Sequence, residues 1–119
     1  MAELATLIVE RQGELQVVRL AGEVDISNAG KLEENISDAV PNDAAGLVVD
    51  LSDTGYLDSA GIRMLFELGQ RLGGRRQSVA VVVPPDSLIR DTLVITELEL
   101  AVPMHGTLDD AVEALRASG

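Results

Sequence analysis

Apolar residues repeat along the chain with two different periods, which predict strands in some segments and helices in others. Runs rich in Val, Ile and Leu, bounded by turn-forming residues, predict strands at 6–10, 14–20, 46–51, 78–83 and 100–104. Apolar residues three and four positions apart predict helices at 27–40, 58–72, 86–95 and 107–116. This order predicts an α/β fold with a mixed, mainly parallel sheet of about four to five strands. The sheet is expected to start with an antiparallel hairpin around Gln12-Gly13 and to carry about four packed helices.

Turn and capping residues mark where several of these elements begin and end. Ser27 is placed to cap the first helix, and Pro41 is placed to stop it. Thr107 and Asp110 are spaced like a capping box at the start of the last helix, with Asp in place of the usual Glu. The polar segment 52–55 ends in Gly, so it predicts a turn after the buried third strand.

The charge and the aromatic content of the chain argue against several classes of binding partner. The 119 residues include 20 acidic and 9 basic residues, and the net charge of −11 would repel phosphate backbones and anionic lipid headgroups. We therefore expect no nucleic-acid partner and no direct membrane contact. With one Tyr, one Phe and no Trp, the core must be aliphatic, and no aromatic platform is expected for stacking bases. The length fits one domain spanning residues 1–119.

The chain contains no Cys, which removes disulfides, thiol nucleophiles and thiolate metal sites together. The first residues include acids where a signal peptide would carry basic residues, and no apolar run approaches a membrane-spanning length. These features predict a cytoplasmic protein, with no cofactor and no metal expected.

Ser59 is the candidate for chemistry, because it follows a buried strand at the start of a helix, where open α/β sheets place their sites. From these residues alone, the favoured interpretation is that Asp58 or Ser59 only caps the helix. A nucleophilic serine is a second interpretation, but the strand-turn-helix elbow needs Gly-x-Ser-x-Gly. The single histidine, His105, also has no acid spaced as a triad partner.

Two binding interpretations of the same segment are weaker. Gly61 and the helix amides could receive an anion, but no Gly-x-x-x-x-Gly-Lys run is present and no basic residue flanks the loop before Arg63. The acids Asp50, Asp53 and Asp58 also make the loop unfavourable to a nucleotide. Three carboxylates along one loop could suggest a metal, yet they are more often a solvated turn than a cage.

Two motifs together resemble a known family. The segment Asp58-Ser59-Ala60-Gly61-Ile62 follows an apolar strand, and Gly22-Glu23-Val24-Asp25 ends an earlier one. This combination resembles the bacterial anti-sigma factor antagonists, which carry the STAS domain, and the likeness runs over essentially the whole chain. In that family the anti-sigma factor acts as a kinase on the serine after the Asp, and the unphosphorylated protein captures that kinase so that the sigma factor is released. The resemblance implies a regulator of transcription that is not itself an enzyme.

Carried over by position, the resemblance makes Ser59 the phosphoacceptor. The partner-binding residues that it implies are Asp25, Asp58, Ser59, Ala60, Gly61, Ile62 and Arg63. The implied partners are an anti-sigma factor serine kinase with a histidine-kinase-like ATPase fold and a serine phosphatase that acts on phosphorylated Ser59. Plainer interpretations exist for Asp25 as a turn residue and for Gly61 as a close-packing residue, and Arg63 stands where many relatives have Gly.

Three other functions remain open on the sequence. A STAS subunit of a transporter or signalling assembly would not need a phosphorylated serine. A small serine hydrolase would be labelled at Ser59 by serine-directed phosphonates. An acidic scaffold without a switch would give no phosphopeptide covering Ser59 in cells.

Overall fold

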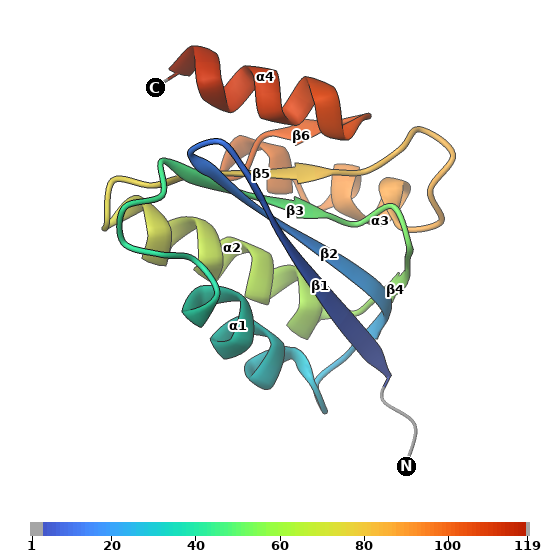
Figure 1. Cartoon of the computed structure of the whole chain (residues 1–119). Helices are drawn as coiled ribbons and strands as arrows, with labels where there is room; N and C mark the ends of the chain where they lie inside the picture. Colours follow the sequence, from blue (N-terminus) through green and yellow to red (C-terminus); the bar gives the residue numbers. More distant parts are fainter. Residues whose placement is uncertain (1–3, 119) are drawn as a thin grey trace.

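The computed structural model describes residues 4–118, in which one β-sheet is covered by helices on both faces (Figure 1). Its six strands are β1 (Ala5–Gln12), β2 (Leu15–Val24), β3 (Gly46–Asp50), β4 (Thr54–Leu57), β5 (Ser78–Val82) and β6 (Met104–His105). Its four α-helices are α1 (Ala29–Asp38), α2 (Ser59–Gly73), α3 (Arg90–Ile95) and α4 (Leu108–Ser118). The predicted α/β class and the predicted set of helices are confirmed.

The sheet is mixed and mainly parallel, as predicted. Its strands follow the order β1-β2-β3-β5-β6, and β4 pairs with the end of β2. β1 and β2 form the expected antiparallel hairpin, in which Leu7 lies opposite Leu20. From β2 onward the neighbours are parallel, and Val17, Val48 and Ala80 lie side by side across three strands. The carboxyl ends of β3 and β4 therefore point toward the same edge of the sheet as the end of β2.

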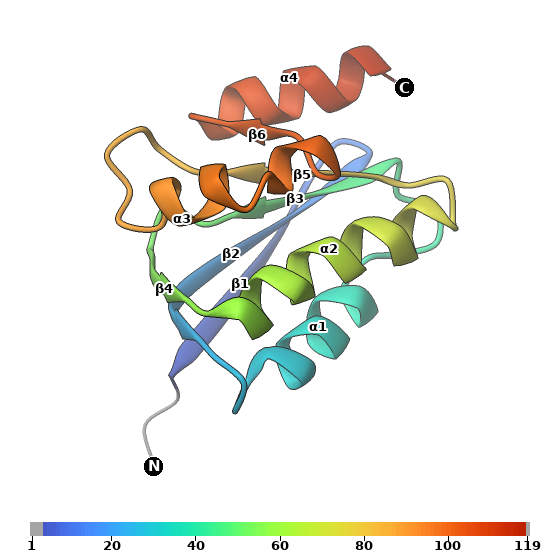
Figure 2. The ribbon, with the colours of Figure 1, turned by 180° about the vertical axis from the view of Figure 1, so that it is seen from behind.

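Alternating residues of the central strands contribute their side chains to two separate apolar layers, one on each face of the sheet. On one face, α1 and α2 pack over the sheet, and α4 covers the other face (Figure 2). All five residues of β3 are buried, which confirms the predicted central strand. Val48 belongs to the layer under α4, whereas Leu47 and Val49 belong to the layer under α1 and α2. Both layers are almost entirely aliphatic, as the composition required.

β4 was not predicted, because we expected only a turn at 52–55. Thr54 is buried, and its hydroxyl donates a 2.6 Å hydrogen bond to the carbonyl of Leu20. Pairing with β2 draws this polar segment into the sheet, and the register of β2 shifts between Gly22 and Glu23 to allow it. The sheet thus has one strand more than the predicted four to five among the described residues, and β4 ends directly before Asp58.

The starts of three helices can be compared with the prediction, and two of them differ from it. Ser27 is not the cap of α1: Asn28 occupies the N-cap position, without a side-chain capping bond. α3 begins only at Arg90, because Ser87 folds back and its hydroxyl accepts a 3.3 Å hydrogen bond from the amide of Ile89. At α4 the capping prediction is confirmed in part, since Thr107 Oγ1 accepts from the amide of Asp110 at 3.1 Å. No helix within residues 4–118 is long and apolar enough to cross a bilayer.

The last strand lies later than predicted. Leu100, which was expected to begin it, instead ends a 3₁₀ turn at Leu98–Leu100, and β6 covers only Met104–His105. Leu98 and Val102 are both fully buried, so this segment packs against the apolar layer by means of a tight turn. The predicted strand at 100–104 was therefore wrong in position, although a short final strand does exist.

Candidate functional site

Asp58 occupies the N-cap of α2 and uses both oxygens of its carboxylate. Oδ1 accepts hydrogen bonds from the amides of Ala60 at 2.8 Å and Gly61 at 3.1 Å, which satisfies two amides that a helix start leaves unpaired. Oδ2 accepts from the amide of Ile26 at 3.2 Å. One carboxylate therefore holds the start of α2 against the loop between β2 and α1, and the predicted cap is confirmed at Asp58.

Asp25 lies in that same loop, and its carboxylate organises the loop itself. Oδ1 accepts hydrogen bonds from both the hydroxyl and the amide of Ser27, and the amide of Asp25 donates to Asn28 Oδ1 at 2.9 Å. The bond from the Ser27 hydroxyl, followed by the bond from its amide, lowers the pKa of Asp25 below its ordinary value. No hydrogen bond within residues 4–118 joins Asp25 to Ser59. The two sequence motifs meet instead through Ile26 and Asp58.

Ser59 is the first residue of α2, and its side chain is exposed. Its hydroxyl makes no hydrogen bond to any other group in residues 4–118. Ala60 and Ile62 are partly buried, and Arg63 is exposed one turn further along the helix. The arrangement presents a primary hydroxyl to solvent on a rigid helix start, so the oxygen can be reached by a second protein.

Gly61 has a packing role at this corner. It is buried, and a Cβ placed on it would come within 2.9 Å of Leu57 Cδ2 and 3.2 Å of Val24 Cγ1. Both of these residues end the paired strands β2 and β4. The absence of a side chain lets α2 start close to the sheet, which agrees with the close-packing interpretation of Gly61.

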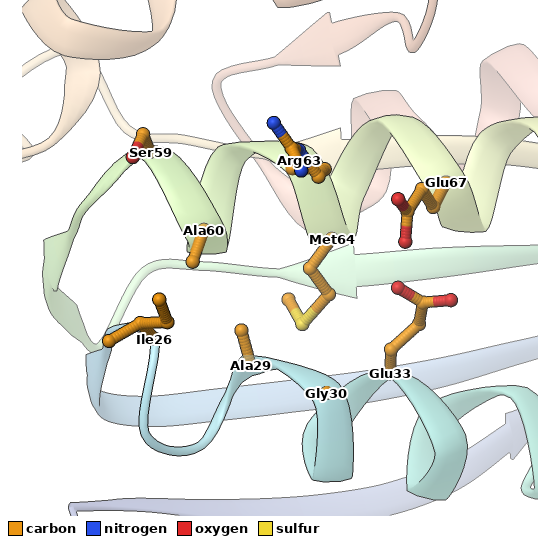
Figure 3. Close-up of a pocket in the computed structure, with 9 residues that line it drawn as sticks. All are labelled: Ile26, Ala29, Gly30, Glu33, Ser59, Ala60, Arg63, Met64 and Glu67. Atoms are coloured by element: carbon orange, nitrogen blue, oxygen red, sulfur yellow. The ribbon is translucent and has the colours of Figure 1, made fainter.

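A groove of about 360 Å³ runs between α1 and α2, with Ser59 at one end (Figure 3). Its lining consists of Ile26, Ala29, Gly30, Glu33, Ser59, Ala60, Arg63, Met64 and Glu67. Ala29 and Met64 are buried and form an apolar floor. Ile26 lies at the same end as Ser59, and its side chain is 85% exposed. Sequence analysis missed Ile26, because one apolar residue in a polar loop has no periodicity.

The other end of the groove holds two carboxylates that face each other, Glu33 from α1 and Glu67 from α2 (Figure 3). Glu33 is 8% exposed, and its Oε2 forms an ion pair with Arg71 Nη2 at 3.1 Å. Burial raises the pKa of Glu33, as do the hydrogen bond and the charge of Glu67, while the charge of Arg71 acts in the opposite direction. Sequence periodicity could not reveal this cluster, because it joins two helices that are far apart in the chain.

The raised pKa of Glu33 predicts a pH-dependent effect of its neighbour. Glu33 contributes its full stability below the ordinary value of 4.5, and this contribution is lost as the pH rises through the raised folded-state pKa. Glu67→Gln removes the like charge, so we expect the variant to be about 0.5 kcal/mol more stable than wild type at pH 7. Urea unfolding should show this difference disappearing below pH 4.5.

Glu113→Gln is the matched control, because this exposed residue lies on α4, on the opposite face of the sheet. Its stability relative to wild type should not follow the same pH dependence. If Glu67→Gln lowered the free energy of unfolding at pH 7, the repulsion between the two carboxylates would not be the dominant interaction there.

A second prediction concerns the bridging carboxylate. Asp58→Ala removes the cap of α2 and the acceptor of the Ile26 amide, so we expect a loss of about 1–2 kcal/mol in the free energy of unfolding. Asp58→Asn keeps one acceptor oxygen and should lose less. Asp53→Ala, in the exposed turn before β4, should stay within about 0.5 kcal/mol of wild type. Equal unfolding energies for Asp58→Ala and Asp53→Ala, measured in urea, would contradict the bridge.

Several residues weighed in the sequence do not join this site. His105 lies in β6 and does not line the groove, so a serine nucleophile would have no histidine base beside it. Asp50 is buried at the end of β3 and accepts a 3.0 Å hydrogen bond from the amide of Ser52, while Asp53 is exposed. Residues 4–118 hold no group of three or more His, Asp or Glu side chains able to bind a metal ion. Asp50, Asp53 and Asp58 therefore do not form one cluster. The amides of Ala60 and Gly61, which could otherwise bind an anion, already donate to Asp58.

Comparisons with known proteins agree with this geometry. The family model described as "Mlab, STAS domain" matches residues 7–103. The chain is 31% identical over 112 residues to the anti-sigma-F factor antagonist RsfB of Mycobacterium tuberculosis, which covers 93% of this chain and 89% of that protein. A crystal structure of an anti-sigma factor antagonist from Mycobacterium paratuberculosis superposes with a TM-score of 0.79, at 33% identity over 94% of both chains.

Two structures of SpoIIAA, the Bacillus cell fate determinant, extend the comparison of the fold. The unphosphorylated form superposes with a TM-score of 0.72 at 19% identity, over 94% of this chain and 97% of that one. The phosphorylated form superposes with a TM-score of 0.66 at 18% identity, over 92% and 99% of the two chains. At these identities the likeness concerns the fold alone.

Proposed function

The chain belongs to the STAS-domain family of anti-sigma factor antagonists, and on this premise we propose that it is a partner switch controlled by phosphorylation of Ser59. Unphosphorylated, it binds an anti-sigma factor and so frees a sigma factor for transcription. Phosphorylated, it releases the anti-sigma factor. The observation that carries the proposal is the exposed, unbonded hydroxyl of Ser59 on a helix start that Asp58 holds rigid.

The modifying enzyme in this proposal is the anti-sigma factor itself, a serine kinase with a histidine-kinase-like ATPase fold. The Ser59 oxygen attacks the γ-phosphorus of the kinase's ATP, the bond from that phosphorus to ADP breaks, and the serine proton leaves to a base of the kinase. This chain supplies only the acceptor oxygen and the surface around it. A serine phosphatase returns Ser59 to its hydroxyl form by hydrolysis, and the cycle takes place in the cytoplasm.

The surface that the partner contacts is proposed to be the corner where the two sequence motifs meet. Ser59 and Arg63 are exposed there, and Asp25 and Asp58 fix the adjacent loop. Ile26 adds an exposed apolar side chain at the same end of the groove. An apolar anchor beside charged groups is a common composition for a protein interface.

Charge explains how the modification would switch binding without refolding. A phosphate adds about −1.5 to −2 charges directly beside Asp58. Like charges brought together in an interface cost several kcal/mol, and about 1.4 kcal/mol already changes an affinity tenfold. The neutral hydroxyl of Ser59 allows docking, and the phosphate opposes it.

The experiment that tests the proposal is affinity capture from an extract of the source organism, with the wild-type chain and Ser59→Asp as paired baits. We expect mass spectrometry to identify an ATPase-type anti-sigma factor with the wild type and not with the variant. Capture of a transporter component by both baits would instead identify a STAS subunit of another assembly. In that case Ser59 would be only the first residue of a capped helix.

A further inference from the structure

The amides that follow Ser59 at the start of α2 are already paired, so they are not available to a phosphate on Ser59. A helix N-terminus normally offers its first amides to an anion. Here the amides of Ala60 and Gly61 already donate to Asp58, at 2.8 Å and 3.1 Å. The amide of Ile62 donates to the carbonyl of Asp58 at 3.1 Å. A phosphate at Ser59 would therefore stand beside the Asp58 carboxylate with only the amide of Ser59 left to offset its charge, so a nearby cation would stabilise it.

Arg63 is the cation that the helix brings to that position. It follows Ser59 by four residues, so the two side chains lie on one face of α2, with Cβ atoms about 5–6 Å apart. Both residues line the groove between α1 and α2, and both line a second hollow along α2 beside Ile62 and Phe66. The order with the anion N-terminal to the cation is the more favourable one on a helix.

Arg63 is also without a competing anion. Its natural partner along the helix is Glu67, but the carboxylate of Glu67 is turned across the groove toward Glu33 (Figure 3). Glu33 in turn is paired with Arg71 at 3.1 Å. Arg63 forms no ion pair within residues 4–118, and its guanidinium points away from the floor of the groove (Figure 3).

We infer that Arg63 binds the phosphate of phosphorylated Ser59 within the same helix, so that its availability to a partner depends on whether Ser59 is phosphorylated. The inference rests on the proposed function, because it assigns a second group to the same site. In the unphosphorylated protein the guanidinium is free to meet an acidic group of the partner. After phosphorylation it is engaged internally through charge-assisted hydrogen bonds, so one modification both adds an anion and removes a cation from the docking surface.

The test uses protein with phosphoserine inserted at position 59 during synthesis, so it requires no kinase. The phosphate is titrated by ³¹P NMR in four backgrounds: wild type, Arg63→Gln, Arg63→Lys and Arg75→Gln. Arg75 is the matched control, because it is an exposed arginine just beyond the far end of α2. Pairing with a cation stabilises the dianion, so Arg63→Gln should move the midpoint to higher pH by about 0.4 of a pH unit.

Arg63→Lys keeps the charge but not the two-pronged geometry, so its midpoint should lie between those of wild type and Arg63→Gln. Arg75→Gln should titrate like the wild type. In wild type, the Arg63 Nε–H resonance should also shift when Ser59 carries the phosphate. An Arg63→Gln midpoint equal to that of Arg75→Gln, with no shift of the Nε–H resonance, would overturn the inference. Failure to capture a kinase would overturn the proposed function and leave this result standing.

Discussion

Ser59→Asp is expected to bind the purified anti-sigma factor about 100-fold more weakly than the wild-type chain does. The substitution places a permanent negative charge at the rim of the docking surface, next to Asp58, and like charges in an interface cost several kcal/mol. A loss of about 3 kcal/mol corresponds to two factors of ten in affinity. Isothermal titration calorimetry or biolayer interferometry measures the difference directly.

Two variants separate this effect from loss of the hydroxyl and from a change in net charge. Ser59→Ala should bind like the wild type, because it adds no charge. Ser78→Asp adds the same charge at the exposed start of β5, which lies at the opposite end of the sheet from the start of α2. Its binding should also be unchanged. Equal affinities for Ser59→Asp and Ser78→Asp would mean that Ser59 lies outside the interface.

Gly22→Ala is expected to destabilise the fold by about 3 kcal/mol, and so to disturb the loop that carries Asp25 and Ile26. Gly22 has a φ of +108°, a backbone conformation that favours glycine. A Cβ at this position would lie 2.2 Å from the carbonyl oxygen of Leu4, and backbone atoms cannot yield as a flexible side chain can. The residue also marks the point where the register of β2 shifts toward β4.

Gly30→Ala is the opposite case and serves as the control. Gly30 lies in the first turn of α1, and a Cβ there would meet no atom within 4 Å. Alanine favours the helix, so this variant should gain about 0.5 kcal/mol of stability. Thermal and urea unfolding of both variants measure whether each substitution lowers or raises the stability of the fold. A Gly22→Ala protein as stable as Gly30→Ala would show that β2 can relax around the new methyl group.

The elements that the sequence predicts well are those set by local periodicity. The β1–β2 hairpin, the buried strand β3 and the long helix α2 follow from apolar spacing and turn residues alone. β4 could not be predicted in this way, because Thr54 and Gly55 are typical of turns. Its strand conformation depends on pairing with β2, which precedes it by about 30 residues, and on the bond from the Thr54 hydroxyl to Leu20.

The residues of the candidate site also fall into two groups, those that the sequence predicts and those that only the packing of the fold brings together. Asp58 as a cap follows from residue type and position, and the family resemblance adds Ser59 as phosphoacceptor and Asp25 as a nearby acid. The structure brings Asp58 and the Asp25 loop together, but through the amide of Ile26. The pairing of Glu33 with Arg71 crosses from α1 to α2, so it depends on how the helices pack and not on any local pattern. Sequence analysis therefore singled out Ser59 as the candidate phosphoacceptor and missed the groove beside it.

The most direct test of the account is to incubate the chain with its purified anti-sigma factor and ATP and to map phosphate by tandem mass spectrometry. The account predicts one added phosphate per chain, located on Ser59, and none on Ser59→Ala under the same conditions. A wild-type chain that gains no phosphate, or a Ser59→Ala chain that gains one at another residue, would contradict the proposal that Ser59 is the switch.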